Sequence, residues 1–415
     1  MDRREFLVAG AAALGAVGAP RAEASPSTSG TRTVTHRRTL FPRLEHEVYL
    51  NAARGTPLAT FAAEGLQQYE EFCRYGAGEG RQDGFYDMLD HIRGDFGRLI
   101  GAKSSEIALV QCTKAGEQIV LEGLPGLRSG GNVVTNDYHY AGSLHNLIGL
   151  QQSGLDVRIV RSADWEVDLD AMRAAIDDRT ALVALTLVSN INGRIEAMAE
   201  LAEMAHAKGA LVYADIIQAA GIMPMDVRQL GIDFAACSGY KWLFGVHGAG
   251  FFYVRDEHQG TVLPDRLFPG SAHHNYAPWA AEPDPEAAPY RYRAPTDARR
   301  YQPGHISYLG FCALHRGLRF IHRVGLETLL AHSVALNQRL LSKVDAERYP
   351  CISPDHEKSP IVTFLGARND VLKTRLREAK VGVTLHGNRI RVSPAIYNTP
   401  EDIDRLADVL AMPDA

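Results

Sequence analysis

Residues 210–244 read ALVYADIIQAAGIMPMDVRQLGIDFAACSGYKWLF, and this stretch decides the fold. Its apolar start is typical of a short buried strand, and Asp215 follows that strand directly. A second apolar run, at residues 234–237, leads into Ser238, Tyr240 and Lys241. A buried acid is costly without a partner, and apolar neighbours disfavour the charged form of a lysine. The stretch therefore predicts two strand ends that hold an acid and a reactive lysine.

Outside this stretch, short β-rich runs alternate with helical stretches. Strands are predicted at residues 107–112, 132–135, 157–160, 181–188 and 250–254, the last as an edge strand, and helices at residues 114–124, 143–152, 168–176 and 196–208. This alternation favours an α/β fold with a mainly parallel sheet and helices on both faces. Ligands bind such sheets at the carboxyl ends of the strands. Asp215 and Lys241 are predicted at that edge.

The C-terminal part has a different texture, which predicts a second, smaller α+β domain. Residues 263–303 are rich in Pro, Tyr and Arg and predict a long functional or interfacial loop. Helices follow at residues 306–324 and 326–343, then short strands, then a last helix from Pro400 with Thr399 as its N-cap. The 415 residues suit a large and a small domain. The predicted division is an N-terminal segment near the active site (41–60), a large cofactor-binding domain (61–304) and a small domain (305–415).

The paired acid and lysine point to one cofactor. A buried neutral lysine and a buried acid serve Schiff-base chemistry with pyridoxal 5′-phosphate (PLP), in which the lysine holds the aldehyde. The acid keeps the pyridine nitrogen protonated, so that the ring accepts electrons from a carbanion. Asp215 and Lys241 are predicted to take these two roles.

Several short motifs together resemble the class V aminotransferase family. The pattern D-x-x-Q…S-G-x-K matches Asp215, Gln218, Ser238 and Lys241. Matches to other family segments occur at residues 48–53 (VYLNAA), 113–117 (TKAGE), 189–193 (SNING), 391–393 (RVS) and 397–399 (YNT). The resemblance implies the PLP-dependent transferase fold type I over nearly the whole chain after its first residues.

The resemblance also implies how the cofactor is held. Lys241 is the catalytic residue, which carries PLP and shuttles the Cα proton. Asp215 pairs with the pyridine nitrogen and Gln218 contacts the ring hydroxyl. An aromatic side chain stacks on the ring, and it is Tyr140 in the best alignment, with His139 as the next candidate. The phosphate lies near Ser238, Tyr240, Ala115 and Gly116, where helix N-terminal N–H groups suit an anion.

The substrate side and the subunit contact follow from the same resemblance. Asn190 and Arg391 meet the substrate carboxylate, and Asn51 lies beside the active site. A guanidinium group matches a carboxylate in shape and charge. Residues 300–305 (RYQPGH) match the segment that reaches the other subunit's phosphate, which implies a homodimer. His305 replaces the usual threonine of that segment, and Ser307 is the alternative donor.

Two further departures from the family pattern bear on function. Gly116 stands where a threonine is usual, so one hydroxyl contact to the phosphate is lost. Residues 381–391 are too short to hold the cysteine loop of cysteine desulfurases, and Cys351 lies too far upstream. Persulfide chemistry on an enzyme cysteine is therefore not expected, while direct C–S lyase chemistry stays open.

The first 24 residues resemble a twin-arginine export signal. Arg3 and Arg4 precede an apolar run that is too short and glycine-rich to span a bilayer, and Ala22-Glu23-Ala24 has the form of a cleavage site. A flexible leader is predicted over residues 25–40. These features predict a periplasmic enzyme that meets the twin-arginine machinery and keeps no stable membrane anchor.

The charge and composition of the chain favour a small-molecule substrate over a nucleic-acid partner. The 49 acidic and 44 basic residues give a net charge of −5, which argues against a nucleic-acid partner. His273 and His274 lack a matching acid or cysteine cluster, so no metal site is expected.

The resemblance is closest to the isopenicillin N epimerase-like branch, and it leaves the reaction open. Deprotonation at Cα begins transamination, epimerisation and β-elimination alike. An aminotransferase is the favoured prediction, because that activity is common on this fold, and an epimerase and a C–S lyase are the alternatives. The alternative from another functional class is a non-catalytic ligand-binding protein. In that case Gly116 and His305 would be signs that the catalytic site has degenerated.

Overall fold

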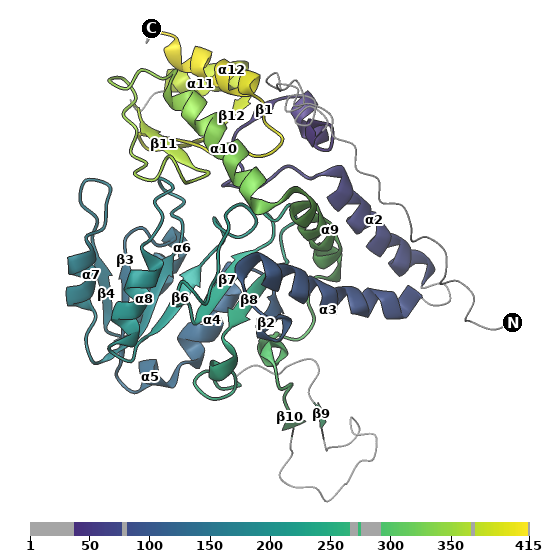
Figure 1. Cartoon of the computed structure of the whole chain (residues 1–415), viewed down its shortest axis with the longest axis vertical. Helices are drawn as coiled ribbons and strands as arrows, with labels where there is room; N and C mark the ends of the chain where they lie inside the picture. Colours follow the sequence, from purple (N-terminus) through teal and green to yellow (C-terminus); the bar gives the residue numbers. More distant parts are fainter. Residues whose placement is uncertain (1–36, 77–80, 266–272, 275–291, 367–369, 414–415) are drawn as a thin grey trace, which may run out of the picture.

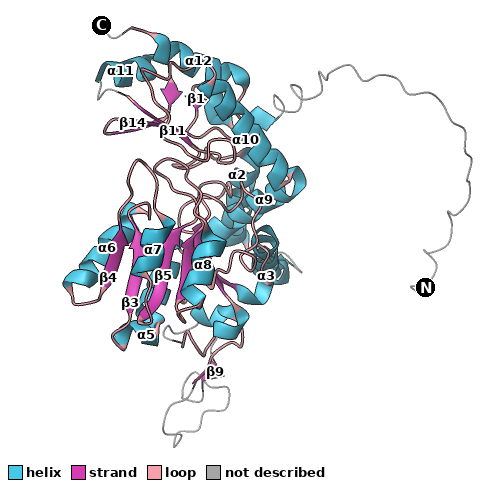
Figure 2. Ribbon diagram, turned by 60° about the vertical axis from the view of Figure 1, so that its left-hand side comes forward, coloured by secondary structure: helices cyan, strands magenta, loops and turns pink. Residues whose placement is uncertain are grey.

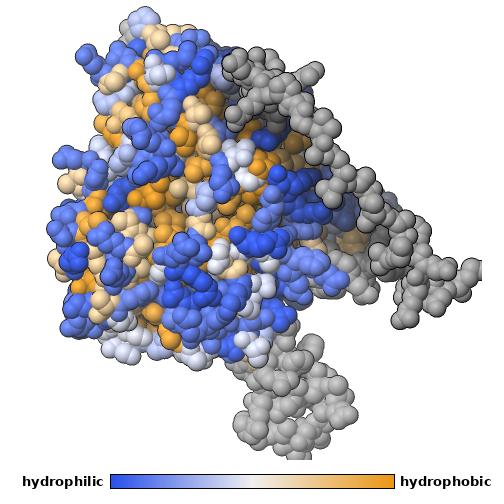
Figure 3. Space-filling model, viewed as in Figure 1, coloured by the Kyte–Doolittle hydropathy of each residue, from blue (hydrophilic) through white to orange (hydrophobic). Residues whose placement is uncertain are grey.

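The computed structural model describes residues 37–76, 81–265, 273–274, 292–366 and 370–413 (Figure 1). A lower unit built around a large sheet and an upper unit with a small sheet lie one above the other, and the predicted signal peptide and most of the predicted leader fall outside the described ranges (Figures 1 and 2). Among the described residues, no helix combines the length and apolar character needed to cross a bilayer. Polar side chains cover much of the face in Figure 3, and apolar residues gather around its middle.

The lower unit holds a seven-stranded sheet in the order β2-β8-β7-β6-β5-β3-β4. Its strands are β2 (Ile107–Val110), β3 (Asn132–Asn136), β4 (Val157–Val160), β5 (Thr180–Thr186), β6 (Leu211–Asp215), β7 (Phe234–Ser238) and β8 (Gly250–Val254). The pairs from β4 across to β7 are parallel, which confirms the predicted mainly parallel sheet. The prediction of an edge strand at residues 250–254 is wrong. β8 lies between β2 and β7, antiparallel to both, and its alternating side chains enter the cores on both faces of the sheet.

Helices cover both faces of this sheet, as predicted. The helices between the strands are α4 (Thr113–Gly123), α5 (Pro125–Arg128), α6 (Ala141–Gln152), α7 (Leu169–Ala175) and α8 (Met198–His206). Two separate apolar cores result: Met172 and Leu201 contribute to one, and Val120 and Leu147 to the other. The sheet is therefore the middle of three layers, and the loops after its strands are left at one edge for a site.

Two long helices that the sequence analysis did not anticipate flank the sheet. They are α2 (Thr60–Tyr75) and α3 (Arg81–Ile100), and α2 packs along α9 (Tyr308–Val324). Contact is so close that a Cβ on Gly65 would lie 2.5 Å from the carbonyl oxygen of Cys312. Buried residues of α9 such as Phe311 and Leu318 join the core of the large unit.

The boundary between the two cores falls within one helix. Leu329 of α10 (Leu326–Leu341) belongs to the core of the large unit, whereas Leu336 belongs to that of the small one. This differs from the predicted division after residue 304, because α9 packs on the sheet layer even though the loop before it ends there.

The small unit contains an antiparallel sheet in the order β11-β14-β13 and two further helices. Its elements are β11 (Val362–Leu365), β13 (Thr384–His386), β14 (Arg389–Val392), α11 (Asp370–Glu378) and α12 (Pro400–Ala411). Thr399 caps α12 as predicted. The N-terminal segment joins this unit, since β1 (Val48–Tyr49) pairs in parallel with β12 (Val381–Gly382). Residue 51 is thereby carried to the junction of the two units.

The remaining elements are short. They are the 3₁₀ helices η1 (Pro42–Glu45), η2 (Ser104–Glu106), η3 (Asp256–His258) and η4 (Ala298–Tyr301), and the antiparallel pair β9 (His273–His274) and β10 (Tyr292–Arg293). Most of the predicted loop at residues 263–303 lies outside the described residues.

Candidate active site

Asp215 ends β6 in the middle of the sheet, paired with Thr186 of β5 and Ala236 of β7. Its side chain is buried and accepts a 2.9 Å hydrogen bond from the backbone N–H of Ile217. Burial raises the pKa of Asp215, although this hydrogen bond and the nearby His139 oppose the rise. Within the described part of the chain Asp215 has no ion-pair partner. The carboxyl group is therefore available to a ligand N–H.

Lys241 lies in a tight turn after β7. The turn is held by a 2.8 Å hydrogen bond from the Thr56 hydroxyl to the Lys241 carbonyl, and Phe244 adopts a φ of 56°, which is rare outside glycine. Lys241 Nζ makes no hydrogen bond or ion pair with any described residue. Burial lowers the pKa of Lys241 to about 8, against the opposing charge of Asp215. A substantial fraction of the amine is thus neutral near physiological pH, as a nucleophile or base requires.

Gln218 is buried between the large unit and the N-terminal segment. Its amide nitrogen donates to the Ala53 carbonyl at 3.0 Å, and its amide oxygen accepts from the Trp242 indole at 2.8 Å. An amide nitrogen carries two N–H groups, so one donor remains for a ligand. The predicted contact with a ring hydroxyl stays a prediction.

The N-terminus of α4 and the end of β7 are joined by a set of short hydrogen bonds. The Ser238 hydroxyl accepts from the Thr113 N–H at 2.8 Å and lies 3.0 Å from the Thr113 hydroxyl, which itself accepts from the Ser238 N–H. Ala115 and Gly116 lie in the first turn of α4. A helix N-terminus at this place suits a phosphate group.

Packing explains why position 116 is glycine. A Cβ there would lie 2.7 Å from the Cβ of Ala236 and 2.9 Å from the ring of Phe252. The residue therefore faces the sheet, and a threonine side chain has no room in this arrangement. The glycine is a consequence of close helix–sheet contact rather than a mark of a decayed site.

Tyr140 and His139, the two candidates for stacking on the cofactor ring, differ in accessibility. His139 is buried, with Nδ1 2.7 Å from the Thr186 hydroxyl and Nε2 3.4 Å from Glu117. Tyr140 is 42% exposed and follows the same strand end, with its backbone N–H bound to Thr186. Tyr140 is thus the more accessible of the two rings, and which of them stacks on the cofactor stays a prediction.

Arg391 of β14 reaches from the small unit towards the strand ends. It donates to the Asn190 carbonyl at 2.6 Å and to the Thr384 hydroxyl at 3.0 Å, and it lies 3.4 Å from the Asn51 amide oxygen. Burial lowers the pKa of Arg391 to about 10. No carboxylate of the described chain pairs with it, and its buried Nε lacks a hydrogen-bond partner. The structure therefore brings the three predicted substrate residues Asn51, Asn190 and Arg391 together around an uncompensated cation.

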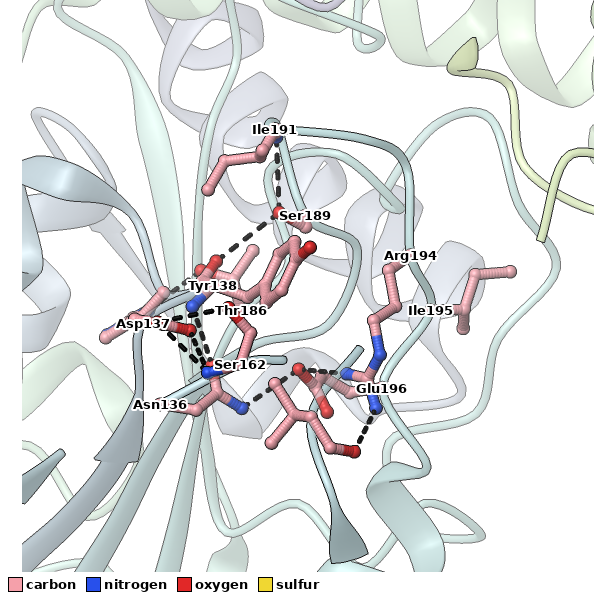
Figure 4. A network of polar contacts seen from close by, with 12 residues as sticks. Asn136, Asp137, Tyr138, Ser162, Thr186, Ser189, Ile191, Arg194, Ile195 and Glu196 are labelled. Atoms are coloured by element: carbon pink, nitrogen blue, oxygen red, sulfur yellow. Dashed lines mark hydrogen bonds and ion pairs between the residues drawn. The ribbon is translucent and has the colours of Figure 1, made fainter. Parts of the chain in front are cut away.

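A polar network fixes the loop that carries Asn190 (Figure 4). Glu196 accepts from Asn136 at 3.0 Å and pairs with Arg194 at 2.6 Å. The Ser189 hydroxyl donates to the Tyr138 carbonyl at 3.4 Å. These contacts join the ends of β3 and β5.

The same loop is tied to the small unit. The Asn192 amide donates to the Ile352 carbonyl at 2.9 Å, the Ser353 hydroxyl donates to the Asn192 carbonyl, and the Thr363 hydroxyl donates to the Ile191 carbonyl at 2.9 Å. Because Arg391 also binds this loop, the geometry of the substrate side depends on both units.

Three predicted residues lie apart from these contacts. His305 is exposed, and the Ser307 hydroxyl caps α9 by accepting from the Gly310 N–H at 3.2 Å. The backbone of Cys351 forms an isolated antiparallel β-bridge with Phe364, and its side chain packs on the core of the small unit. Burial raises the pKa of the Cys351 thiol. Within the described ranges, no group of three or more His, Cys, Asp or Glu side chains could hold a metal ion.

Thr113, Thr186, Thr384 and Arg54 border the site but were not singled out from the sequence. Thr113 begins the family segment at residues 113–117, and only the fold brings it next to Ser238. Thr186 is the strand partner of Asp215, which follows once β5 and β6 are paired. Thr384 and Arg54 match none of the family motifs; Thr384 reaches Arg391 through the pairing of β13 with β14, and Arg54 lies in the N-terminal segment close to Asn51.

A family model described as Aminotransferase class-V matches residues 66–406. The chain belongs to the class V aminotransferase family. It is 28% identical over 408 residues to the probable cysteine desulfurase of Methanothermobacter thermautotrophicus, covering 91% of this chain and 97% of that relative. It is 25% identical over 375 residues to the uncharacterized aminotransferase YcbU of Bacillus subtilis, covering 90% and 96%. A solved structure of C-DES with glycine covalently linked to its PLP cofactor matches with a TM-score of 0.77 at 19% identity, over 90% of this chain and 98% of that chain.

The chain is thus a PLP-dependent class V enzyme with the fold predicted from its sequence. The residues present fit the cofactor. Three features are grouped at one edge of the sheet: a buried amine with no hydrogen bond or ion pair to any described residue, a buried acid with one backbone donor, and a helix N-terminus. Lys241, Asp215 and the first turn of α4 would hold its aldehyde carbon, its ring nitrogen and its phosphate.

Proposed function

We propose that the enzyme is an aminotransferase that acts on an α-amino acid. The observation that carries the proposal is Arg391, a buried guanidinium that has no acidic partner among the described residues and is held on the substrate side of the site by Asn190 and Asn51. A free carboxylate is the group that such a cation binds. The substrate amino group would then face the Lys241 side of the site.

The side chains divide the work by position. Bound PLP draws electrons from the substrate Cα. The Lys241 amine takes the Cα proton and returns it to another carbon, a role that suits a base with a pKa of about 8. Asp215, whose pKa is raised by burial, holds a proton at the cofactor's ring nitrogen. Arg391 fixes the substrate so that its Cα–H bond lies within reach of Lys241.

A C–S lyase is the second candidate, favoured by the names of relatives. One relative is a probable cysteine desulfurase, and C-DES is described as a cystine C–S lyase. A persulfide on Cys237, Cys312 or Cys351 is disfavoured, since Cys237 and Cys312 are buried with raised pKa values and Cys351 packs on the core of the small unit. Sulfur would then leave directly with the substrate fragment.

Incubation with single amino acids in the absence of a keto acid separates the candidates. An aminotransferase converts its bound cofactor stoichiometrically to the amine form and stops. A lyase releases sulfide or persulfide from cysteine or cystine over many turnovers, and an epimerase racemises the substrate with the cofactor spectrum retained. Protein that takes up no PLP would contradict the enzyme proposal as a whole. Lys241→Ala is the control for all three reactions.

We also propose export by the twin-arginine route and a homodimer in the periplasm. The support for export is the Arg3-Arg4 pair with its following apolar run, and the support for the dimer is the family segment at residues 300–305. Replacing both arginines by lysine should leave the enzyme in the cytoplasm, as cell fractionation would show. Light scattering of the purified protein tests the dimer.

A further inference from the structure

A short loop at residues 51–56 is fixed against the cofactor side of the site. The Ala53 carbonyl accepts from Gln218, and the Thr56 hydroxyl donates to the Lys241 carbonyl. A Cβ on Gly55 would lie 3.5 Å from the ring of Tyr240. Arg54 stands in the middle of this loop with an exposed side chain. Its backbone is therefore placed by the same residues that are predicted to hold the cofactor.

A second arginine approaches from the small unit. Arg389 and Arg391 are two positions apart on β14, so their side chains leave the same face of the strand. Arg389 is half-buried. Thr384, which binds Arg391, is the strand partner of Arg391 on β13. Arg389 thus lies on the same face of β14 as Arg391, on the side of Arg391 away from the bridge between Asn51 and Ser393.

The part of the chain that the structure describes places no counter-charge on these three arginines. In the described ranges, neither Arg54 nor Arg389 nor Arg391 forms an ion pair, whereas the buried Arg194 is paired with Glu196. The charges of Arg54 and Arg389 also reach Arg391, where both act to lower its pKa. Three like charges around one site repel one another. One substrate carboxylate compensates only one of them.

We propose that the natural substrate is an acidic α-amino acid, whose second carboxylate is bound by Arg54 and Arg389 while its α-carboxylate is bound by Arg391. The proposal rests on the proposed function, because it assigns a substrate class to the same site. The side-chain carboxylate of the substrate supplies the charge that the site lacks. The corresponding amide offers no such charge and is discriminated against, as one lost charged contact is worth about 10- to 100-fold in affinity.

Binding of non-reactive acids to the PLP-loaded enzyme provides the first test. Glutarate and butyrate differ by one carboxylate, and their binding is followed by the visible absorbance of the cofactor and by the shift in melting temperature. Glutarate should bind at least about 10-fold more tightly than butyrate to the wild type. The double variant Arg54→Gln/Arg389→Gln should lose that preference and keep its affinity for butyrate. The double variant Arg319→Gln/Arg323→Gln, which removes two exposed charges on α9, is the matched control for net charge.

Turnover provides the second test and separates this proposal from the proposed function. The kcat/KM for glutamate and aspartate should exceed that for glutamine and asparagine, and the double variant should erase the difference. If amino acids react but acids and amides react equally well, the assignment of Arg54 and Arg389 is overturned and the aminotransferase stands. If no amino acid reacts while glutarate is still preferred, the anion site stands and the aminotransferase fails. Equal binding of glutarate and butyrate by the wild type overturns the second carboxylate site.

Discussion

Two buried aspartates belong to the neighbouring parallel strands β6 and β7 and differ in their hydrogen-bond partners. Asp215 lies at the carboxyl end of β6, and Asp233 lies at the amino end of β7. Asp233, just before β7, accepts hydrogen bonds from the Val212 N–H at 2.8 Å and lies 2.8 Å from His206 Nε2 and 2.9 Å from His258 Nε2. These partners outweigh burial and lower the pKa of Asp233 to about 2. Asp215 ends β6 with one backbone donor and a raised pKa.

The difference separates a structural acid from a functional one. Both side chains are about equally buried, so burial alone does not decide their protonation. An acid that is surrounded by donors has no capacity left for a ligand, whereas an under-bonded acid retains it. Lys241 extends the contrast, because the buried amine next to Asp215 also lacks a partner among the described residues.

Removing Lys241 should have the largest effect at the functional end. Lys241→Ala should lower kcat by at least ~10³-fold, since the base that moves the Cα proton is lost. The variant should also lack the visible absorbance band of the lysine-bound cofactor. Its melting temperature without cofactor should stay equal to or above that of the wild-type apo-protein, because Lys241 Nζ forms no hydrogen bond with a described residue that the substitution would break. A marked loss of stability would place Lys241 with the structural residues instead.

Uptake of PLP by the apo-protein should depend steeply on pH. The pKa of Lys241 is lowered to about 8, and only the neutral amine reacts with an aldehyde. The neutral fraction, and with it the uptake rate, should rise about 50-fold from pH 6 to pH 8 and level off above pH 9. Stopped-flow absorbance measures the rate. A lysine with its ordinary pKa of 10.5 would instead give a rate that still rises tenfold per pH unit at pH 9.

The contrast between the two aspartates was only half visible in the sequence. Asp215 and Lys241 belong to one contiguous stretch with a recognisable spacing, so local patterns predicted both strand ends and their chemistry. Asp233 lies in the same stretch, but its structural role was not predicted, because its partners His206 and His258 come from other elements. From the sequence alone, an aspartate surrounded by hydrogen-bond donors cannot be told from one that keeps free acceptor capacity, because the donors come from other elements.

Non-local pairing accounts for most of what the sequence did not predict. The predicted strand at residues 250–254 was correct, but its place at the edge was wrong, since the place depends on pairing with β2 far earlier in the chain. Likewise, α9 was predicted as a helix but assigned to the small domain, and only its packing on α2 shows where it belongs. Asn51 comes from a segment far from Arg391 in the chain, whereas Thr384 is joined to Arg391 by the pairing of β13 with β14, and family resemblance found Arg391 and Asn51 only.

Neutralising the two aspartates should invert their effects on stability and activity. Asp233→Asn should lower the free energy of unfolding by about 2–3 kcal/mol, because it removes charged hydrogen bonds to two histidines. Asp215→Asn should change the stability of the apo-protein by less than about 1 kcal/mol and should lower activity strongly, since the cofactor's ring nitrogen loses its acid partner. Urea unfolding and initial rates measure the two effects. Equal losses of stability in both variants would contradict the assignment of Asp233 as a structural acid and of Asp215 as a functional acid.

Acid should erase the contribution of Asp233 specifically. Its pKa is lowered from 3.8 to about 2 in the folded state, so the unfolded chain binds the proton first as the pH falls. The stabilisation is fully present above pH 5, amounts to roughly 2 kcal/mol, and is lost as the pH falls from about 4 to 2. The difference in unfolding free energy between the wild type and Asp233→Asn should therefore shrink between pH 5 and pH 3, as urea titrations at several pH values would show. Asp215→Asn serves as the matched comparison. Because the pKa of Asp215 is raised rather than lowered, its ionised carboxylate destabilises the folded state at neutral pH. As the pH falls and this carboxylate is protonated, the unfolding free energy of the wild type should therefore rise relative to that of Asp215→Asn.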